Sequence, residues 1–309
     1  MVLFTSDRPL ERAENIKAVY DAFDGEKDFI QTDPWCYNPE VASSKYRVRV
    51  TDEFVCSSPR KTVMIGHGIS GGKLFGLDQK YPYFRRANAR FLSYVICTSE
   101  ATRDLVATQC GVSISDVLPL GMPRTDAYFG KRKGDGKTFL AKKRSYLYAP
   151  TWRSAKEMQM PELDWQLLDS LLEDNEVFVV KPHMITRKIL HGKYRHIIEA
   201  PSDRPSTPYL IDCDVLITDY SSIMLDAHVL NKPVVLFEKI KGSADMRGMY
   251  LKYPDEYSSR YCTNEMNLVE IVRTAFEPLE ADKKCREFTA SACDGHSSER
   301  VTELIGKIL

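Results

Sequence analysis

Short apolar runs that do not alternate with polar residues recur along this chain. A strand with one face open to water alternates apolar and polar residues, whereas a run that is apolar throughout suits a strand covered on both faces. Helical stretches separate most of these runs, as in 11–23, where Ile16, Val19, Tyr20 and Phe23 recur at helical spacing. This alternation predicts an α/β protein with parallel sheets. The strand-like runs are 28–30, 46–50, 63–65, 94–98, 146–149, 177–180, 215–218 and 234–237.

The composition indicates a globular protein in which any anion binding must be local. The 309 residues are 43% hydrophobic and 28% charged, which is enough for two domains with sizeable cores. Lysine plus arginine and aspartate plus glutamate both number 43, so no overall positive field attracts nucleic acid, and we expect no nucleic-acid partner. The opening residues 1–8 reach acid and base too soon for a secretory signal, and no apolar run has membrane-spanning length.

The cysteines point to a cytosolic protein without a metal centre. All eight are scattered, with no C-x-x-C pair and no cysteine and histidine cluster at zinc spacing. We therefore expect reduced thiols, no disulfide framework and no essential metal.

A basic, glycine-rich segment at 130–137 interrupts the order of strands and helices. Its sequence GKRKGDGK has no apolar residue that would anchor it, which favours a solvated linker between two α/β halves. With Lys142, Lys143 and Arg144 it forms the alternative of a basic patch that faces anionic lipid or a polyanionic acceptor.

The stretch 214–226 runs from a short apolar strand through two acids and two hydroxyls into a helix pattern. We expect the side chain of Ser221 or Ser222 to cap the start of that helix. The same free N–H groups and the helix dipole attract phosphate, so the stretch predicts an anion site. Simple capping of a helix remains the alternative at this point.

Polar clusters follow several of the predicted strands, at the point where each strand ends. In open α/β sheets ligands bind beyond the carboxyl ends of the strands, so these residues should converge. They supply histidines, arginines, a lysine, hydroxyls and acids, which is the inventory of a site for a phosphorylated substrate. The clusters are Gly66-His67-Gly68, Gly121 to Asp126 with Arg124, Thr151-Trp152-Arg153, Lys181-Pro182-His183 and Asp219 to Ser222.

The segment 66–71 also matches the G-x-G-x-x-G fingerprint of dinucleotide-binding proteins. That fingerprint should open a helix at once and be followed about 20 residues later by an acid. Here Gly72 and Gly76 make a poor helix start, and the nearest acid, Glu100, comes late, so nicotinamide or flavin binding is disfavoured. A histidine between two glycines instead predicts an exposed imidazole on a tight turn, suited to a general base. A role for His67 in packing or capping alone is the other interpretation.

Taken in order, these motifs resemble the CDP-glycerol glycerophosphotransferases, the family of teichoic acid primases and polymerases with relatives that transfer ribitol phosphate or build capsules. The resemblance covers nearly the whole chain. It departs from the family pattern after His67-Gly68, where Ile69-Ser70-Gly71-Gly72 precedes Lys73 in place of threonine, proline and paired lysines, and this leaves the acceptor open. The further matching segments are Leu3-Phe4, Ala18-Val19-Tyr20, Leu147 to Arg153, Lys232-Pro233, Arg247-Gly248-Met249-Tyr250, Asp294-Gly295 and Arg300-Val301.

The resemblance implies a GT-B-like α/β fold, with two Rossmann-like domains whose parallel sheets face a central cleft. The expected domains are an acceptor domain at 1–135, a CDP-donor domain at 136–290 and a final helix at 291–309 that crosses back to the first domain. The implied reaction moves a polyol phosphate, glycerol phosphate in the first instance, from CDP-glycerol or CDP-ribitol to a hydroxyl of a lipid-linked or oligosaccharide acceptor. It releases CMP and serves teichoic acid or capsule-type polymer synthesis, without an essential cofactor, in the cytoplasm or in peripheral contact with the inner face of the membrane.

The resemblance also assigns roles to residues. His67 is the expected general base and His183 the second catalytic residue, while Gly68, Lys73 and Asp126 are placed on the acceptor side. Two other interpretations remain, in which the protein is either a GT-B glycosyltransferase that uses a nucleotide sugar or a nucleotide-binding protein without turnover. The expected donor and phosphate ligands are Arg124, Thr151, Arg153, Lys181, Ser221, Ser222, Asp219 and Asp226, with Arg247 as a further candidate.

Overall fold

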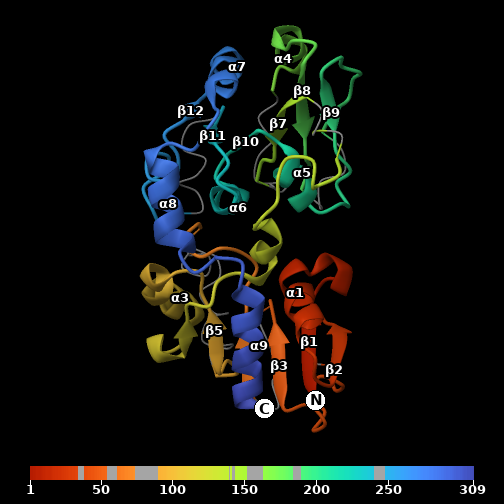
Figure 1. Ribbon diagram of the computed structural model, residues 1–309, viewed down its shortest axis with the longest axis vertical. Helices are drawn as coiled ribbons and strands as arrows, with labels where there is room; N and C mark the ends of the chain where they lie inside the picture. The colour runs from red at the N-terminus through yellow and green to blue at the C-terminus, as the bar shows by residue number, and fades with distance from the viewer. Residues whose placement is uncertain are drawn as a thin grey trace. The chain divides into compact units, whose positions relative to one another are not determined.

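Two parallel β-sheets organise the chain, one in each of two units (Figure 1). The computed structural model describes residues 1–33, 38–53, 61–73, 90–138, 140, 143–151, 163–183, 189–239 and 248–309. The first unit, called the N-terminal unit here, comprises Met1–Phe129 and Glu287–Leu309, and the second, the C-terminal unit, comprises Gly130–Arg286. The prediction of two α/β units with parallel sheets is confirmed.

The sheet of the N-terminal unit has the order β2-β1-β3-β4-β5-β6, and every neighbouring pair is parallel. The central strand β1 is buried along its whole length, which explains why it is apolar almost throughout. Phe4 of this strand lies opposite Phe29 on one side and Val50 on the other. The strands are β1 (Val2–Ser6), β2 (Lys27–Gln31), β3 (Val48–Thr51), β4 (Lys61–Met64), β5 (Tyr94–Ile96) and β6 (Val117–Leu118).

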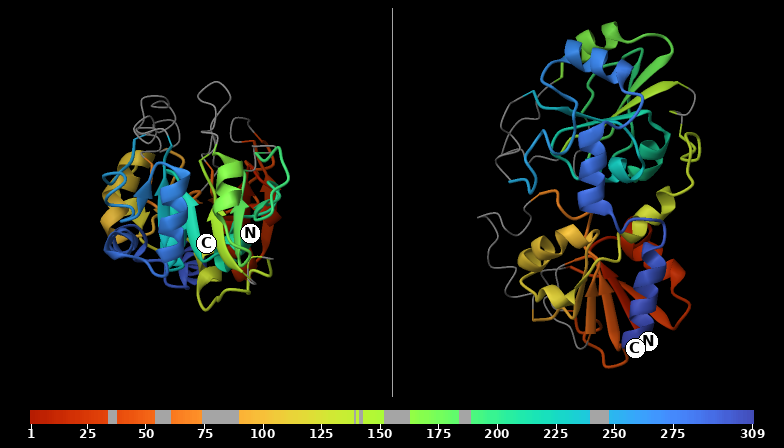
Figure 2. Two further views of the ribbon diagram at one scale, coloured as in Figure 1. Left: turned by 90° about the horizontal axis from the view of Figure 1, so that it is seen from above. Right: turned by 60° about the vertical axis from the view of Figure 1, so that its left-hand side comes forward.

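The last helix of the chain, α9 (Ser297–Ile308), packs in the N-terminal unit against α1 (Glu14–Ala22) and η4 (Pro123–Tyr128). Arg47 and Lys61 donate to the carbonyls of the last two residues, so both ends of the chain lie close together in this unit (Figures 1 and 2). The other helical elements here are η1 (Leu10–Arg12), η2 (Glu100–Thr102), α3 (Arg103–Cys110) and η3 (Ile114–Asp116), while α8 (Glu280–Ala290) leads into the unit.

The sheet of the C-terminal unit has the order β12-β11-β10-β7-β8-β9 and is also parallel throughout. Tyr146, Phe178 and Ile217 from three neighbouring strands form part of one core with Leu168 of α4 and Leu268 of α7. The strands are β7 (Arg144–Tyr148), β8 (Glu176–Val180), β9 (Ile197–Glu199), β10 (Val215–Thr218), β11 (Val234–Phe237) and β12 (Tyr261–Cys262), and the helices besides α8 are α4 (Trp165–Leu171), α5 (Thr207–Asp212), α6 (Ile223–Val229) and α7 (Glu265–Thr274).

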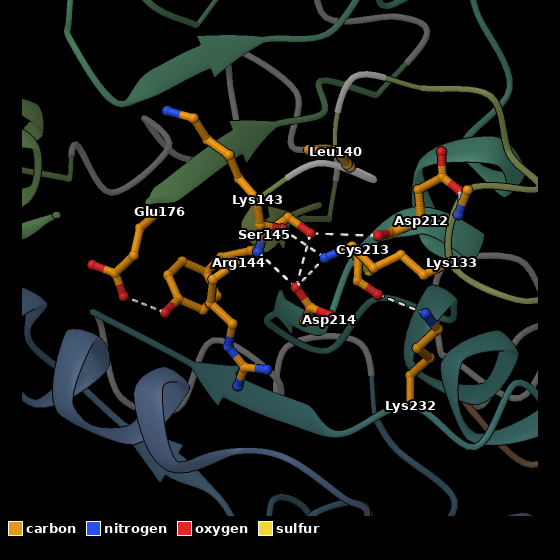
Figure 3. A network of polar contacts seen from close by, with 12 residues as sticks. Lys133, Leu140, Lys143, Arg144, Ser145, Glu176, Asp212, Cys213, Asp214 and Lys232 are labelled. Carbon is orange, nitrogen blue, oxygen red and sulfur yellow. Dashed lines mark hydrogen bonds and ion pairs between the residues drawn. The ribbon is translucent and has the colours of Figure 1, made fainter. Parts of the chain in front are cut away.

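The glycine-rich segment 130–138 is anchored on the C-terminal unit. Both oxygens of the buried Asp212 carboxylate accept bonds from it, from the backbone N–H groups of Gly134, Gly136 and Thr138 at 2.7 to 2.9 Å and from the Thr138 hydroxyl at 2.6 Å. Lys133 adds an ion pair of 2.6 Å to Asp214, in the network of Figure 3. The segment is largely exposed, as expected of a solvated linker, but it is not unanchored, because a buried carboxylate supplies the anchor that apolar side chains do not.

Most elements expected from the sequence are present. Each strand-like run forms a strand, with ends shifted by no more than two residues. The helix expected at 11–23 begins only at Glu14, after the short turn η1. Four strands were not among the predicted runs, namely β1, β6, β9 and β12, and the last three of these have only two or three residues each. Among the described residues no helix has the length and apolar character needed to cross a membrane.

The cysteines within the described residues are all free and buried, as expected. Burial raises the pKa of Cys97 to about 11 and that of Cys213 to about 12, so these thiols stay protonated at neutral pH.

Candidate active site

In each sheet the order of the strands reverses beside the first strand of its unit, and site residues gather there. In the N-terminal unit β1 has β2 on one side and β3 on the other, while in the C-terminal unit β7 lies between β10 and β8. The carboxyl ends of strands at such a switch point form the crevice in which open α/β sheets bind ligands. The predicted site residues follow β4 in the first unit and β7, β8 and β10 in the second.

The tight turn after β4 presents His67, as the glycines predicted. Gly66 has φ +79°, a left-handed conformation that glycine adopts without strain. The buried Asn15 of α1 donates to the carbonyl of Gly66 at 3.2 Å, and Arg124 of η4 donates to the carbonyl of His67. Asn15 also accepts a bond of 3.1 Å from the backbone N–H of Arg124. One buried amide therefore fixes the positions of His67 and Arg124 together.

Both ring nitrogens of His67 face charged groups from neighbouring strands. Nη2 of Arg8, which follows β1, lies 2.7 Å from Nδ1, and Oε1 of Glu53, which follows β3, lies 3.2 Å from Nε2. Loss of hydration lowers the pKa of His67, but the carboxylates of Glu53 and Asp52 outweigh this effect and hold the pKa above its ordinary value. The ring keeps 44% of its surface exposed, so a substrate can reach it. This is the arrangement of an accessible base with a buried acidic partner.

Asp52 and Glu53 are buried, with 2% and 5% of their surfaces exposed. Burial raises the pKa of both carboxyl groups, although the charges of His67 and, for Asp52, of Arg8 oppose this. With His67 they form a group whose potential ligand atoms all lie within 4.8 Å of one another, the one such group among the described residues that could hold a metal ion. Sequence spacing did not indicate this group.

The three residues predicted on the acceptor side differ in their surroundings. Gly68 lies beside the Arg124 guanidinium, and the carbonyl of Lys73 accepts a bond of 3.3 Å from Gln109. Both oxygens of Asp126 accept backbone N–H bonds from the start of α9, at 3.0 Å from Ser297 and 2.7 Å from Ser298. Asp126 therefore caps a helix, and a role on the acceptor side stays a prediction.

In the C-terminal unit the switch point joins Thr151 to Asp219. Asp219, directly after β10, accepts bonds from the backbone N–H of Thr151 at 2.8 Å and from its hydroxyl at 2.7 Å. Asp219, one of the predicted donor ligands, thus orients a threonine that follows β7, and its role toward a donor stays a prediction. Oδ1 of Asp219 accepts the protons of both the backbone N–H and the hydroxyl of Thr151. The Thr151 hydroxyl is therefore a donor in this bond, and its oxygen can still accept a bond from another donor.

Lys181 and His183 follow β8, the neighbour of β7. Lys181 is buried, and its ammonium group donates to the carbonyls of Pro182 at 3.0 Å and Ser202 at 3.3 Å. Burial lowers the pKa of this ammonium group, partly opposed by the charge of Asp203. His183 is exposed. The structure thus brings a buried cation and an accessible imidazole to the carboxyl end of one strand.

The junction after β10 starts α6 differently from the expectation. Ser222 is the N-cap residue, but its side chain makes no capping hydrogen bond. Its helical backbone angles, φ −62° and ψ −15°, differ from the extended conformation that directs a capping hydroxyl at the helix. The expectation of a serine side-chain cap is wrong for Ser222. Asp226, in the first turn of α6, is buried.

Two predicted ligands, Arg153 and Arg247, lie outside the described residues, so their roles stay predictions. The residues that sequence reasoning missed are Arg8, Asn15, Asp52 and Glu53. Asp52 and Glu53 follow β3, which was predicted, so the rule that found His67 applied to them as well. Arg8 follows β1, which was not among the predicted strands. Asn15 lies on α1, and no local signal identifies it.

Comparison with known proteins gives a consistent result. The family described as CDP-glycerol:poly(glycerophosphate) glycerophosphotransferase matches residues 8–307 of this chain. The teichoic acid poly(ribitol-phosphate) polymerase of Bacillus spizizenii is 28% identical over 263 residues, a match that covers 79% of this chain and 42% of that protein. The teichoic acid glycerol-phosphate primase of Bacillus subtilis is 27% identical over 263 residues, covering 81% of this chain and 68% of that protein. The chain thus spans less than half the length of the first relative.

The fold has a close counterpart among solved structures. A histidine-to-asparagine variant of the wall teichoic acid polymerase TagF, soaked with CDPG, superimposes with a TM-score of 0.79. The two chains are 18% identical, and the match covers 99% of this chain and 88% of the other. This similarity supports the fold independently of the sequence motifs.

Proposed function

The chain belongs to the CDP-glycerol:poly(glycerophosphate) glycerophosphotransferase family, a family of transferases, and on this basis we propose that it transfers a polyol phosphate from a CDP-linked donor to a hydroxyl of a lipid-linked or glycan acceptor, with release of CMP. Glycerol phosphate from CDP-glycerol is the first substrate to test, with ribitol phosphate from CDP-ribitol second, because relatives of both kinds are similar to this chain. The product would be a teichoic acid or a capsule-type polymer.

The observation that carries this proposal is the division of chemistry between the two switch points. The N-terminal unit holds an accessible imidazole beside a buried carboxylate, which suits proton removal from a hydroxyl. The C-terminal unit holds a lysine, a histidine and hydroxyl groups at the carboxyl ends of adjacent strands, which suits a diphosphate. A phosphotransferase with two substrates needs both kinds of site.

In the proposed reaction the acceptor oxygen attacks the β-phosphorus of the donor. A new bond forms between that oxygen and phosphorus, the bond to the bridging oxygen breaks, and its electron pair leaves with CMP. His67 takes the proton of the hydroxyl, a contribution of about 10²- to 10⁴-fold in rate for a positioned general base. The reaction requires the substrates held by the two units to meet.

The donor phosphates are the proposed ligands of the C-terminal residues. His183 and Lys181 would offset the charge that grows on the leaving CMP, and the serine hydroxyls would hold phosphate oxygens. Arg124, which belongs to the N-terminal unit, is proposed as a further phosphate ligand. Hydrogen bonds to charged groups are each worth about 1.5–3 kcal/mol. Asp219 would act indirectly by orienting Thr151. Asp226 would likewise act by orienting another side chain of the donor site. Arg153 is also proposed to bind the donor phosphates, and Arg247 is proposed as a further phosphate ligand.

The cellular setting is proposed from the acceptor. A lipid-linked acceptor places the enzyme in the cytoplasm with peripheral contact to the inner face of the membrane. Lys131, Arg132 and Lys137 are exposed on the anchored segment 130–138 and offer charges to anionic lipid. Lys133 is less suited to this role because it is paired with Asp214.

Purified protein given CDP-glycerol, CDP-ribitol and UDP-sugars in turn, with a lipid-linked acceptor, tests the proposal. We expect CMP release and an acceptor whose mass grows by polyol phosphate units. Release of UDP alone would identify a glycosyltransferase. Exchange of His67 for alanine should abolish transfer while CDP binding remains, and a wild-type protein that binds CDP without turnover would instead be a binding protein.

A further inference from the structure

The contacts of His67 define which ring nitrogen carries its proton. A guanidinium group has N–H donors and no acceptor, so the Nη2 of Arg8, at 2.7 Å, can only donate to Nδ1. Nδ1 is then the acceptor, and the proton of the neutral ring lies on Nε2, the nitrogen that faces Glu53. In this state neither nitrogen is open to an acceptor hydroxyl.

The two partners of the His67 ring differ in their exposure to solvent. Glu53 is buried, with 7% of its side chain exposed, and follows strand β3. Its Oε1 lies at ion-pair distance from Nε2, without the alignment of a full hydrogen bond. Arg8 is 30% exposed, and its distances to the buried carboxylates are long, 3.5 Å to Asp52 and 3.8 Å to Glu53. Glu53 is thus the buried neighbour of the ring, and Arg8 is the neighbour that a substrate anion can reach from solvent.

The electrostatic effects on the ring are opposed. Loss of hydration lowers the pKa of His67, Glu53 and Asp52 raise it, and Arg8 lowers it. The other charged groups around the ring are Asp7, paired with Arg8 at 3.1 Å, and Arg124, which donates to the backbone carbonyl of His67. Departure of Arg8 would therefore both free Nδ1 and make the ring a stronger base.

We propose, building on the phosphotransfer function above, that Arg8 covers Nδ1 of His67 until a substrate phosphate draws it away, and that Glu53 is the positioning residue that keeps the proton on Nε2. Once Arg8 binds a phosphate oxygen, Nδ1 accepts the proton of the acceptor hydroxyl as its oxygen attacks the β-phosphorus. The bridging oxygen leaves with the electron pair as part of CMP. Glu53 stabilises the imidazolium until His67 releases the proton to solvent.

The rival interpretation is a divalent cation held by Asp52, Glu53 and His67, whose ligand atoms lie close enough for it. Arg8 argues against it, because its permanent charge already lies against all three groups. Two like charges would compete for the same carboxylates.

Nitrogen-15 NMR of the imidazole groups, combined with kcat measured against pH, tests the proposal on the full chain. At a pH above the pKa of His67 we expect the wild-type ring to be neutral, with its proton on Nε2. The E53Q variant should lower the pKa of His67, move the acid limb of the kcat profile to lower pH and reduce the plateau by about tenfold or more. The R8A variant should raise the pKa of His67 and raise the KM for the CDP-linked donor. E11Q, which changes an exposed glutamate of the same unit, is the matched control.

A wild-type pKa of His67 and unchanged kcat in E53Q would overturn the proposal. So would loss of wild-type activity with a chelator together with its recovery, and broadening of the His67 signals, on addition of Mn²⁺. If E53Q does not fold, R8A decides alone, since an unchanged pKa of His67 and an unchanged KM for the donor would contradict the role of Arg8. A wild type that releases no CMP refutes the phosphotransfer function itself, whereas the NMR signals still report whether Arg8 and Glu53 set the state of the ring.

Discussion

At the scale of single residues, Asn15 shows how one buried amide serves two parts of the site. Its side chain bonds to the carbonyl of Gly66 and to the backbone N–H of Arg124, while only 3% of its surface is exposed. Buried backbone groups that lose their partner cost about 1–3 kcal/mol each, so the pair of bonds holds the turn and η4 in register. The position of His67 thus depends on a residue that takes no part in the chemistry.

We therefore expect the exchange Asn15→Ala to lower kcat/KM by about tenfold or more, because it removes the bonds that the Asn15 amide makes to two half-buried backbone groups. Rates of CMP release and thermal unfolding measure this, with Asn267→Ala, on the exposed face of α7, as the control. Wild-type kinetics in the Asn15 variant would show that the turn holds its shape without the amide.

At the scale of elements, Asp212 replaces a hydrophobic anchor. It ends α5 and accepts four bonds from the segment 130–138, in the region drawn in Figure 3. Lys232 reinforces the end of this helix by donating to the carbonyls of Ile211 at 2.7 Å and Cys213 at 2.6 Å. Burial raises the pKa of Asp212, but the donors of Thr138, Gly134 and Gly136 outweigh this effect and hold the pKa below its ordinary value. The carboxylate therefore remains charged.

The exchange Asp212→Ala should free the segment without unfolding the sheet. We expect trypsin to cleave after Lys131, Arg132 or Lys137 about tenfold faster or more, because local opening loses several charge-assisted bonds. Limited proteolysis followed by mass spectrometry identifies the sites. Asp255→Asn, an exposed acid, serves as control, and equal cleavage of both variants would mean that Asp212 does not anchor the segment.

At the scale of the whole molecule, the two sheets repeat one architecture with different chemistry at the switch point. The N-terminal sheet carries a base and acids, and the C-terminal sheet carries a lysine, a threonine and serines. We therefore expect the nucleotide of the donor to bind to the C-terminal unit. This separation follows from the residues that come after the strands.

Hydrogen exchange with saturating CDP-glycerol tests the separation. A ligand present at 100 times its Kd stabilises the native state by about 2.7 kcal/mol, so amides near 149–151, 181–183 and 219–222 should exchange more slowly. Thr151→Val should weaken this protection, whereas Thr302→Val on α9 should leave it intact. Protection confined to the N-terminal unit would contradict the assignment of the donor site.

The outcome for individual residues shows where sequence reasoning succeeds. Runs such as 215–218 and 234–237 predicted strands at their observed bounds, because burial on both faces leaves a local record in every residue of the run. The glycines around His67 predicted its turn for the same reason, since positive φ is a property of one residue. The serine cap failed because the backbone at Ser222 is helical, which composition does not reveal.

Local patterns in the amino-acid sequence are sufficient to predict the parallel α/β fold, the family and the strand ends that carry His67, Thr151 and Asp219. The pairing of Arg8 and Glu53 with His67, and of Asp219 with Thr151, depends on the tertiary fold. The physical reason is the range of the interactions. Apolar periodicity and backbone conformation are local, whereas these contacts join the ends of different strands, and which ends meet depends on the order of the strands in the sheet.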